Sequence, residues 1–317
     1  MARFIRVTTV AYQGVEQGAD FHARTRDKMA DYLEQAALAK PDLVVLPETF
    51  NMGGIPWEQW PENAEAIPGP LTDRAAEIAA KHKMVVCVPL LERDGDTLYN
   101  TACFLDREGQ VLGKYHKVQP TIGEMEAGIV PGTDAPAWDT DFGKLGAAIC
   151  FDLKFVEVGQ RLAANEARVV CFVSAFIGGD RILHWCRDFG FYVVSSCSAR
   201  SYIADMAGRF LASSGWEDNQ VRAGLLPPIL STVINTDRML FHLDYNQNKF
   251  QEILKKYGPG VEIENHYPEA HFTLASLRDD VTVEDLVAEF ELETWTQYLA
   301  RARRERDKYL RQAGIET

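Results

Sequence analysis

The chain has 317 residues, 46% of them hydrophobic, and a formal net charge of −13 at pH 7. A chain of this size can bury a sizeable core, either as one large α/β domain or as two ordinary ones. The acidic balance argues against a general nucleic-acid surface, because phosphate binding needs clustered Lys and Arg. No apolar run approaches the roughly 20 residues of a membrane span, and the N-terminus begins a strand without the apolar segment of a signal peptide. We therefore expect a cytoplasmic protein without membrane contact, whose partners are small molecules.

Short apolar runs alternate with amphipathic stretches through the first half of the chain, which is typical of a layered α/β fold. We expect strands at Ile5–Tyr12, Asp42–Glu48, Met84–Leu91, Leu98–Asp106 and Gln110–His116, and helices at Phe21–Lys40 and Leu71–Lys83. The turn at residues 106–109 joins the last two strands as a hairpin. Residues 118–136, rich in Pro, Gly and acidic side chains, are predicted to form a loop.

The alternation continues in the second half. We expect strands at Lys144–Ile149, Arg168–Ser174, Phe191–Ser196, Ser198–Ala204, Arg209–Ser213 and Ile229–Thr236, with helices at Val156–Ala167 and Arg181–Phe189. No linker rich in Gly, Ser or Pro and no repeat of the solenoid type interrupts this pattern. One large domain is therefore the simpler interpretation.

The C-terminal part has a different pattern. A helix at Asp244–Tyr257 is predicted to end at Gly258, and Thr282 is the predicted N-cap of one long helix whose far end carries Arg and Lys. Those cations either complement the helix dipole as a solvated end or form an arm that reaches a partner subunit. We therefore divide the chain into a main domain, residues 1–280, and a C-terminal helical extension, residues 281–317, as the expected oligomer contact.

The six cysteines include no Cys-x-x-Cys pair and no His spacing that would form a zinc site; they are Cys87, Cys103, Cys150, Cys171, Cys186 and Cys197. Four of them lie within apolar strand-like runs and a fifth, Cys186, within a predicted helix, where a free thiol acts as a small buried hydrophobe. Cys150 differs because it closes a predicted strand. No metal ligands are expected.

An acid, an ammonium and a thiol stand at the ends of three predicted strands: Glu48, Lys117 and Cys150. A thiol has an unperturbed pKa of about 8.5, so a nucleophilic thiol needs a nearby base or a positive field. A partly desolvated Glu48 can be that base. Lys117 and the backbone N–H of Phe151 can stabilise an oxyanion. These are the parts of a nucleophilic acyl-transfer site.

The three residues lie in the sequences Leu46-Pro-Glu48, Lys114-Tyr-His-Lys117 and Ala148-Ile-Cys-Phe-Asp152. In this order and at these separations the motifs resemble the nitrilase (carbon-nitrogen hydrolase) superfamily and its Glu-Lys-Cys triad, over roughly residues 4 to 236. The resemblance implies an α/β fold, a four-layer αββα sandwich. It also implies Glu48 as general base, Lys117 as oxyanion stabiliser and Cys150 as nucleophile, in a homodimer or higher homo-oligomer.

The same family places a second glutamate a few residues after the lysine. The sequence Lys117-Val-Gln-Pro-Thr-Ile-Gly-Glu124 resembles the motif of some family members and favours Glu124, with Glu126 as the alternative. Either residue could orient Lys117 and help to position the attacking water by hydrogen bonding.

Two departures from the family pattern bear on the substrate. Lys154 stands where many members have arginine, and it could contact a substrate carboxylate or form a salt bridge with Asp152 or Glu157. True nitrilases typically place Trp-Glu after the cysteine, whereas this chain has Phe151-Asp152. We therefore favour amides over nitriles.

Further candidates for substrate contact are Ser174, Phe176 and Trp185, with core or loop packing as the alternative for each. Together with Phe151 and Lys154, Ser174 and Phe176 form the expected substrate-binding set.

The sequence thus predicts a cysteine-dependent hydrolase of non-peptide carbon-nitrogen bonds, without metal or organic cofactor. Its substrate would be a small linear carboxamide or N-carbamoyl compound, cleaved through a thioester with release of ammonia or an amine. The alternatives are a nitrilase or an amide-forming acyltransferase on the same triad, and a non-catalytic assembly protein. A Ser-His-Asp hydrolase and a dinucleotide-binding protein lack support, because neither Gly-x-Ser-x-Gly nor Gly-x-Gly-x-x-Gly occurs.

Overall fold

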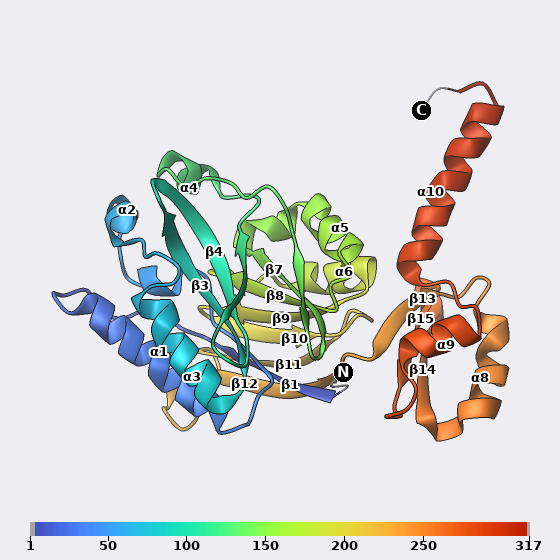
Figure 1. The fold of residues 1–317 in the computed structure, drawn as a ribbon, viewed down its shortest axis with the longest axis horizontal. Helices are drawn as coiled ribbons and strands as arrows, with labels where there is room; N and C mark the ends of the chain where they lie inside the picture. The colour runs from blue at the N-terminus through green and yellow to red at the C-terminus, as the bar shows by residue number, and fades with distance from the viewer. Residues whose placement is uncertain (1–3, 316–317) are drawn as a thin grey trace.

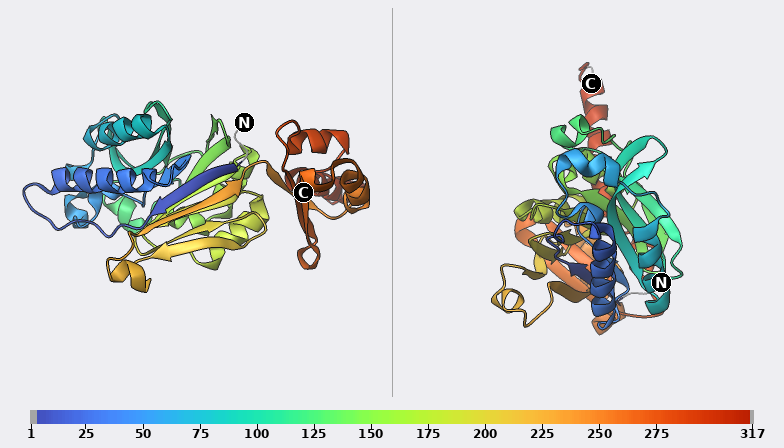
Figure 2. Two further views of the ribbon diagram at one scale, coloured as in Figure 1. Left: turned by 90° about the horizontal axis from the view of Figure 1, so that it is seen from below. Right: turned by 90° about the vertical axis from the view of Figure 1, so that its left-hand side faces the viewer.

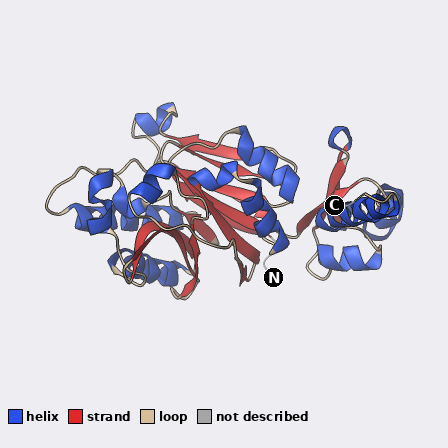
Figure 3. Cartoon of the chain, turned by 90° about the horizontal axis from the view of Figure 1, so that it is seen from above, coloured by secondary structure: helices blue, strands red, loops and turns tan. Residues whose placement is uncertain are grey.

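The computed structural model describes residues 4–315. Two six-stranded sheets pack face to face, and helices cover the outer face of each sheet (Figures 1 and 3). The predicted four-layer αββα sandwich is therefore confirmed.

The first sheet combines parallel and antiparallel strands. In spatial order its strands are β12 (Ile229–Asn235), β1 (Phe4–Val10), β2 (Leu43–Val45), β3 (Val85–Asp94), β4 (Thr97–Leu105) and β5 (Val111–His116). Helices α1 (Phe21–Ala37) and α3 (Pro70–His82) cover its outer face (Figure 1). Pro70 starts α3, where its fixed φ suits a first turn, and Lys83 ends α3 with a φ of +54°.

The second sheet repeats this plan. In spatial order its strands are β11 (Phe210–Gly215), β10 (Arg200–Ala204), β9 (Tyr192–Cys197), β8 (Val169–Ser174), β7 (Gly143–Ile149) and β6 (Ala137–Thr140). Helices α5 (Val156–Ala164) and α6 (Asp180–Phe189) cover its outer face (Figure 1). Gly159 of α5 allows close packing against α6, because a Cβ at this position would lie 2.1 Å from the Phe189 ring.

Side chains of the first sheet alternate between two cores, as the pleat requires. Val45 and Phe104 pack toward the second sheet, whereas Val44 and Cys103 pack toward α1 and α3. This two-sided burial explains why the strand sequences are almost continuously apolar.

The segment 118–136 differs from its prediction as a loop, because it contains the short helix α4 (Ile122–Glu126). Thr121 caps this helix: its Oγ1 accepts a hydrogen bond from Glu124 N at 3.2 Å, and Glu124 Oε2 accepts one from Thr121 N at 2.6 Å. This reciprocal capping box satisfies two N–H groups that a short helix would otherwise leave unpaired. Two other short helices are α2 (Trp60–Asn63) and α7 (Asn219–Arg222).

Residues 238–276 contain strands that the sequence did not predict, whereas the part after residue 281 is helical as expected. The strands β13 (Arg238–His242), β15 (His271–Ser276) and β14 (Val261–His266) form a third sheet, which packs with α8 (Phe250–Tyr257) and α9 (Val283–Glu289). Phe241, Phe272 and Leu286 lie in its separate core. The expected division at residue 280 passes through this core.

The single long helix predicted after Thr282 is two helices. Helix α9 ends at Glu289, Glu291 has a φ of +49°, and Thr294 caps a second helix, α10 (Trp295–Gln312). Figures 1 and 2 show α10 as a rod that projects away from the rest of the molecule. None of the residues of α10 is buried.

Two further observations concern residues 4–315 as a whole. No helix in this range combines the length and apolar character that crossing a membrane requires. Within the same range, no three His, Cys, Asp or Glu side chains gather as a metal site would need.

Candidate active site

The ends of four strands, drawn from both large sheets, meet around Cys150. Glu48 lies three residues after β2, Lys117 and Cys150 directly follow β5 and β7, and Ser174 is the last residue of β8. Glu48 connects the two sheets, because its Oε2 accepts a hydrogen bond from Ala175 N just beyond β8 at 2.8 Å. The structure therefore brings together the acid, the ammonium and the thiol that the sequence placed at strand ends.

The chain turns sharply at Cys150, which has a φ of +50° and starts the 3-10 helix η3 (Cys150–Lys154). A left-handed conformation at a residue other than glycine is uncommon and is held by its surroundings. Asp152 supplies much of that support: its carboxylate accepts hydrogen bonds from Tyr115 Oη at 2.6 Å, Gln119 N at 2.8 Å and Ile149 N at 2.9 Å. Burial raises the pKa of Asp152 to about 6.

Lys117 is buried between two carboxylates. Its Nζ lies 2.8 Å from Glu48 Oε1, and 2.9 and 2.8 Å from Glu124 Oε1 and Oε2. The three side chains are at most 5% exposed. Burial alone would lower the pKa of Lys117, but the charges of Glu48, of Cys150 once it ionises at high pH, and of Glu124 outweigh it and hold that pKa above its ordinary value. Lys117 is therefore a fixed cation, not a base.

The thiol of Cys150 is neutral at neutral pH. Burial, and next the charge of Glu48, raise the pKa of Cys150 to about 12, against the smaller effects of Lys117 and a hydrogen bond with Ser174. The thiol also hydrogen-bonds Glu48. A nucleophilic reaction at this sulfur therefore requires transfer of its proton to a base as the new bond forms, and Glu48 is in place to take it.

The second glutamate at the site is Glu124. It is 2% exposed and contacts Lys117 directly, whereas Glu126, two residues later in α4, is exposed. Burial would raise the pKa of Glu124, but the charge and hydrogen bonds of Lys117 hold it below its usual value.

The other predicted residues have different surroundings. Ser174 is fully buried and hydrogen-bonds the thiol, so it contacts Cys150 itself. Phe151 packs edge-on against Phe155, with ring centroids 5.2 Å apart. The ammonium of Lys154 lies 5.4 Å from the ring centroid of the half-buried Phe176, so these two candidates adjoin each other.

Trp185 is the one candidate that the structure removes from the site. Its side chain is 3% exposed and packs against Phe189 and Phe191 in the layer beneath α6. Trp185 therefore packs in the core, which was the alternative to substrate contact.

Two contributors were missed from the sequence. Asn100 of β4 donates from Nδ2 to Glu48 Oε1 at 2.8 Å and to Glu124 Oε1 at 2.7 Å. Tyr115 of β5 donates a hydrogen bond from its hydroxyl to Asp152, which in turn supports the turn at Cys150. A signal existed in each case, since an amide and a phenol at fully buried strand positions must find hydrogen-bond partners.

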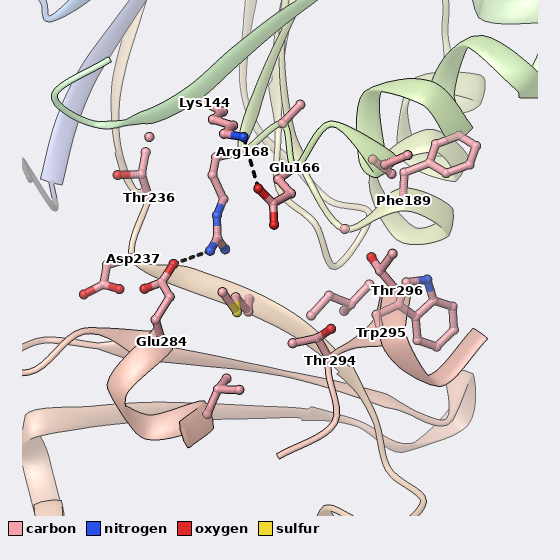
Figure 4. Close-up of a pocket in the computed structure, with 18 of the residues that line it drawn as sticks. Lys144, Glu166, Arg168, Phe189, Thr236, Asp237, Glu284, Thr294, Trp295 and Thr296 are labelled. Atoms are coloured by element: carbon pink, nitrogen blue, oxygen red, sulfur yellow. Dashed lines mark hydrogen bonds and ion pairs between the residues drawn. The ribbon is translucent and has the colours of Figure 1, made fainter. Parts of the chain in front are cut away.

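A cavity of about 630 Å³ lies elsewhere, between the sandwich and the C-terminal unit (Figure 4). Two ion pairs line the cavity. Arg168 of the sandwich pairs with Glu284 of the C-terminal unit, and Lys144 pairs with Glu166, also of the sandwich, at 3.1 Å. None of the residues that meet at Cys150 lines this cavity. It belongs to the joint between the two units.

The carbon-nitrogen hydrolase family model matches residues 9–228. Among curated proteins, the chain is similar to the bifunctional nitrilase/nitrile hydratase NIT4B of Lupinus angustifolius, at 33% identity over 55% of this chain and 56% of that protein. It is also similar to Nitrilase 2 of Arabidopsis thaliana, at 32% identity over 55% of this chain and 58% of that protein. The match thus spans little more than half the length of these relatives.

Solved structures show the same fold. Nit3 of Saccharomyces cerevisiae, a member of branch 10 of the nitrilase superfamily, has a TM-score of 0.63 at 23% identity, over 74% of this chain and 91% of its own. An amidase from Nesterenkonia sp. also has a TM-score of 0.63, at 20% identity over 80% of this chain and 96% of its own. The sandwich is thus that of the nitrilase superfamily. Because the family model matches more than half of the chain, the protein belongs to the carbon-nitrogen hydrolase family.

Proposed function

We propose that the protein is a cysteine amidase that hydrolyses a small linear carboxamide or an N-carbamoyl compound. The observation that carries this proposal is the contact of one carboxylate, Glu48, with the thiol of Cys150 and with Lys117. A neutral thiol beside a paired carboxylate suits attack on a neutral carbonyl, with the proton passing to the carboxylate.

In the proposed reaction, Cys150 Sγ attacks the carbonyl carbon while Glu48 takes the thiol proton. The oxyanion that develops is stabilised by the positive charge of Lys117 and by a hydrogen bond from the backbone N–H of Phe151. The C–N bond then breaks, and Glu48 returns the proton to the leaving ammonia or amine. Water, deprotonated by Glu48 with help from Glu124, then attacks the thioester carbonyl. The C–S bond breaks, Glu48 returns the proton to the Cys150 sulfur, and the carboxylic acid is released. The steps sum to amide plus water giving acid plus ammonia.

Substrate contacts in this proposal come from Phe151 and from the pair formed by Lys154 and Phe176. An ammonium held over an aromatic ring retains free N–H groups, so Lys154 could bind a carboxylate at the far end of the substrate. Omega-amides and N-carbamoyl amino acids carry that group. Ser174 is proposed to contact the thiol and substrate together.

Nitrile hydrolysis is the second candidate, favoured by the nitrilase names of the curated relatives. Its first step is the same attack of Cys150, on a C≡N carbon. The residues after Cys150 favour the amide, because Phe151-Asp152 stand where true nitrilases typically have Trp-Glu.

The test is ammonia release from amides, N-carbamoyl compounds and nitriles with matched acyl groups, with and without an amine acceptor such as hydroxylamine. The Cys150→Ala variant should lose turnover and form no acyl adduct by intact mass. The Cys103→Ala variant, which changes a buried thiol facing α1 and α3, should keep both. Amide turnover retained by Cys150→Ala would contradict the assignment, and faster turnover of nitriles than amides would favour the second candidate.

We also propose that α10 is an arm that contacts a second copy of the chain in a homo-oligomer. Two observations support this: α10 buries no residue, and it carries the chain's clustered Arg and Lys while the chain as a whole is acidic. Light scattering of the full chain and of a form ending at Ala302 tests it. The same number of chains per particle in both forms would contradict the proposal.

A further inference from the structure

The candidate active site has more negative than positive charge. Glu48 and Glu124 face a single cation, Lys117, and the ammonium's three short contacts all go to their oxygens. An ammonium has three N–H donors, so these contacts use all of them. Two buried carboxylates that share one cation tend to take up a proton between them. A proton on the pair would remove the base that Cys150 needs.

Asn100 supplies the missing donors. Its Nδ2 carries two N–H groups, one directed to Glu48 Oε1 at 2.8 Å and one to Glu124 Oε1 at 2.7 Å. The opposite orientation of the amide would place Oδ1 against two carboxylate oxygens, so the hydrogen-bond network fixes the assignment. The backbone carbonyl of Asn100 also accepts from Lys117 N at 2.9 Å. Asn100 thus contacts both carboxylates through its side chain and the backbone of Lys117 through its carbonyl.

The other half of the amide points to the same role. Asn100 Oδ1 is buried and has no hydrogen-bond partner among residues 4–315. A buried acceptor without a partner costs stability, and the two charge-assisted hydrogen bonds donated by Nδ2 offset that cost.

We propose that Asn100 is a positioning residue that holds the carboxylates of Glu48 and Glu124 around Lys117 and keeps Glu124 ionised, so that Glu48 can accept the thiol proton of Cys150. The inference rests on the proposed function, since it concerns the base of that reaction. A neutral amide suits the task because it adds two donors without adding a second cation.

Two variants of Asn100 separate its donors from its shape. Asn100→Leu has a similar volume and no donor, and Asn100→Asp keeps the outline but adds a third carboxylate. The titratable groups around this position are Glu48 after β2 and Glu124 of α4, which Asn100 contacts, and Lys117 after β5 and Cys150 after β7, which both contact Glu48. Loss of the donors should raise the pKa of Glu124, which the hydrogen bond from Asn100 helps to hold low.

The assay follows the rate at which Cys150 reacts with iodoacetamide, by intact mass, between about pH 4 and pH 9. The Cys150→Ala variant is the blank for the five buried cysteines. The acidic limb is the pH range over which the alkylation rate falls as the solution becomes more acidic. For Asn100→Leu we expect the midpoint of this limb to rise by about one pH unit, which is a tenfold change in proton affinity. For Asn100→Asp we expect the midpoint to rise further. The readout needs no substrate, so a failure to find amidase activity leaves it intact.

Thr101→Val is the matched control. Thr101 is the next residue of β4, is equally buried, and donates from Oγ1 to the buried Glu92 at 2.7 Å, outside the site. The Thr101→Val variant should keep the midpoint of the acidic limb at the pH found for the native protein. An unmoved midpoint in both Asn100 variants, even with slower alkylation, would overturn the proposal, as would an equal shift in Thr101→Val. If thermal unfolding shows that Asn100→Leu does not fold, Asn100→Asp decides alone.

Discussion

Replacing Tyr115 by Phe tests how the turn at Cys150 is held. Tyr115 is fully buried, and its hydroxyl donates to Asp152 Oδ2 at 2.6 Å. The substitution removes that single oxygen and leaves the ring packing. The two backbone donors to the same carboxylate, from Ile149 and Gln119, remain.

The expected loss is about 2 kcal/mol at pH 8, because a hydrogen bond to an ionised group contributes roughly 1.5–3 kcal/mol. The unfolding entropy is roughly 2.1 cal/mol/K per residue, or about 0.7 kcal/mol/K for the whole chain. A loss of this size therefore lowers the midpoint of thermal unfolding by about 3 °C.

The loss should depend on pH. Burial raises the pKa of Asp152 from 3.8 to about 6. Because the folded-state pKa lies above the unfolded value, the contribution of Asp152 to stability is fully present below pH 3.8 and is lost as the pH rises through about 6. The Tyr115 hydroxyl offsets that loss by stabilising the charged form. Its removal should thus cost about 2 kcal/mol at pH 8 and only about 1 kcal/mol at pH 5.

Urea unfolding at the two pH values measures both numbers. The matched control is Tyr192→Phe, since Tyr192 is also buried and donates to the carbonyl of Asn235 at 3.0 Å, while its other partner, Arg238, keeps its charge at both pH values. We expect about 1 kcal/mol for this variant at both pH values. Equal losses for the two variants at pH 8, or a Tyr115→Phe loss that does not shrink at pH 5, would refute the reasoning.

Three further outcomes are expected. Glu124→Gln should lower kcat for ammonia release about 100-fold, whereas Glu126→Gln, an exposed change two residues away, should not; equal effects would count against the contact with Lys117. Phe241→Ala should cost about 3–5 kcal/mol in the third sheet and give calorimetry a separate early transition, with Cys150 alkylation retained; a single transition would contradict independent cores. Deleting residues 303–317 should leave the thermal midpoint of dilute, monomeric protein within about 2 °C, because none of residues 303–315 is buried within the chain; a larger fall in the monomer would contradict this.

Much of the sandwich was predictable because its strands are short, apolar and separated by amphipathic helices. The site was predictable because Glu48, Lys117 and Cys150 each follow a strand, and strand ends meet at the edges of sheets. Asn100 was not found, because its role depends on the β4–β5 register, which places it beside Lys117. That register is a property of the folded sheet.

The C-terminal unit was predicted poorly for two physical reasons. Val261–His266 alternates apolar and polar residues with a period of two, but its strand carries Glu262 and Glu264, which lower its β propensity. The apolar spacing of α9 continues to Phe290, so the break was visible only from the second capping box, formed by Thr294 with Gln297. Local capping thus overrode the longer apolar pattern.

Glu124 belongs to two structures at once. Its Oε2 accepts from Thr121 N, which closes the first turn of α4, and from Lys117 Nζ. A five-residue helix has no stability of its own in water, so α4 persists only through such contacts. Folding of residues 121–126 and assembly of the charge cluster are therefore one equilibrium. The fraction of molecules with a complete site is set by a single helical turn at the surface, where Ile122 is 71% exposed.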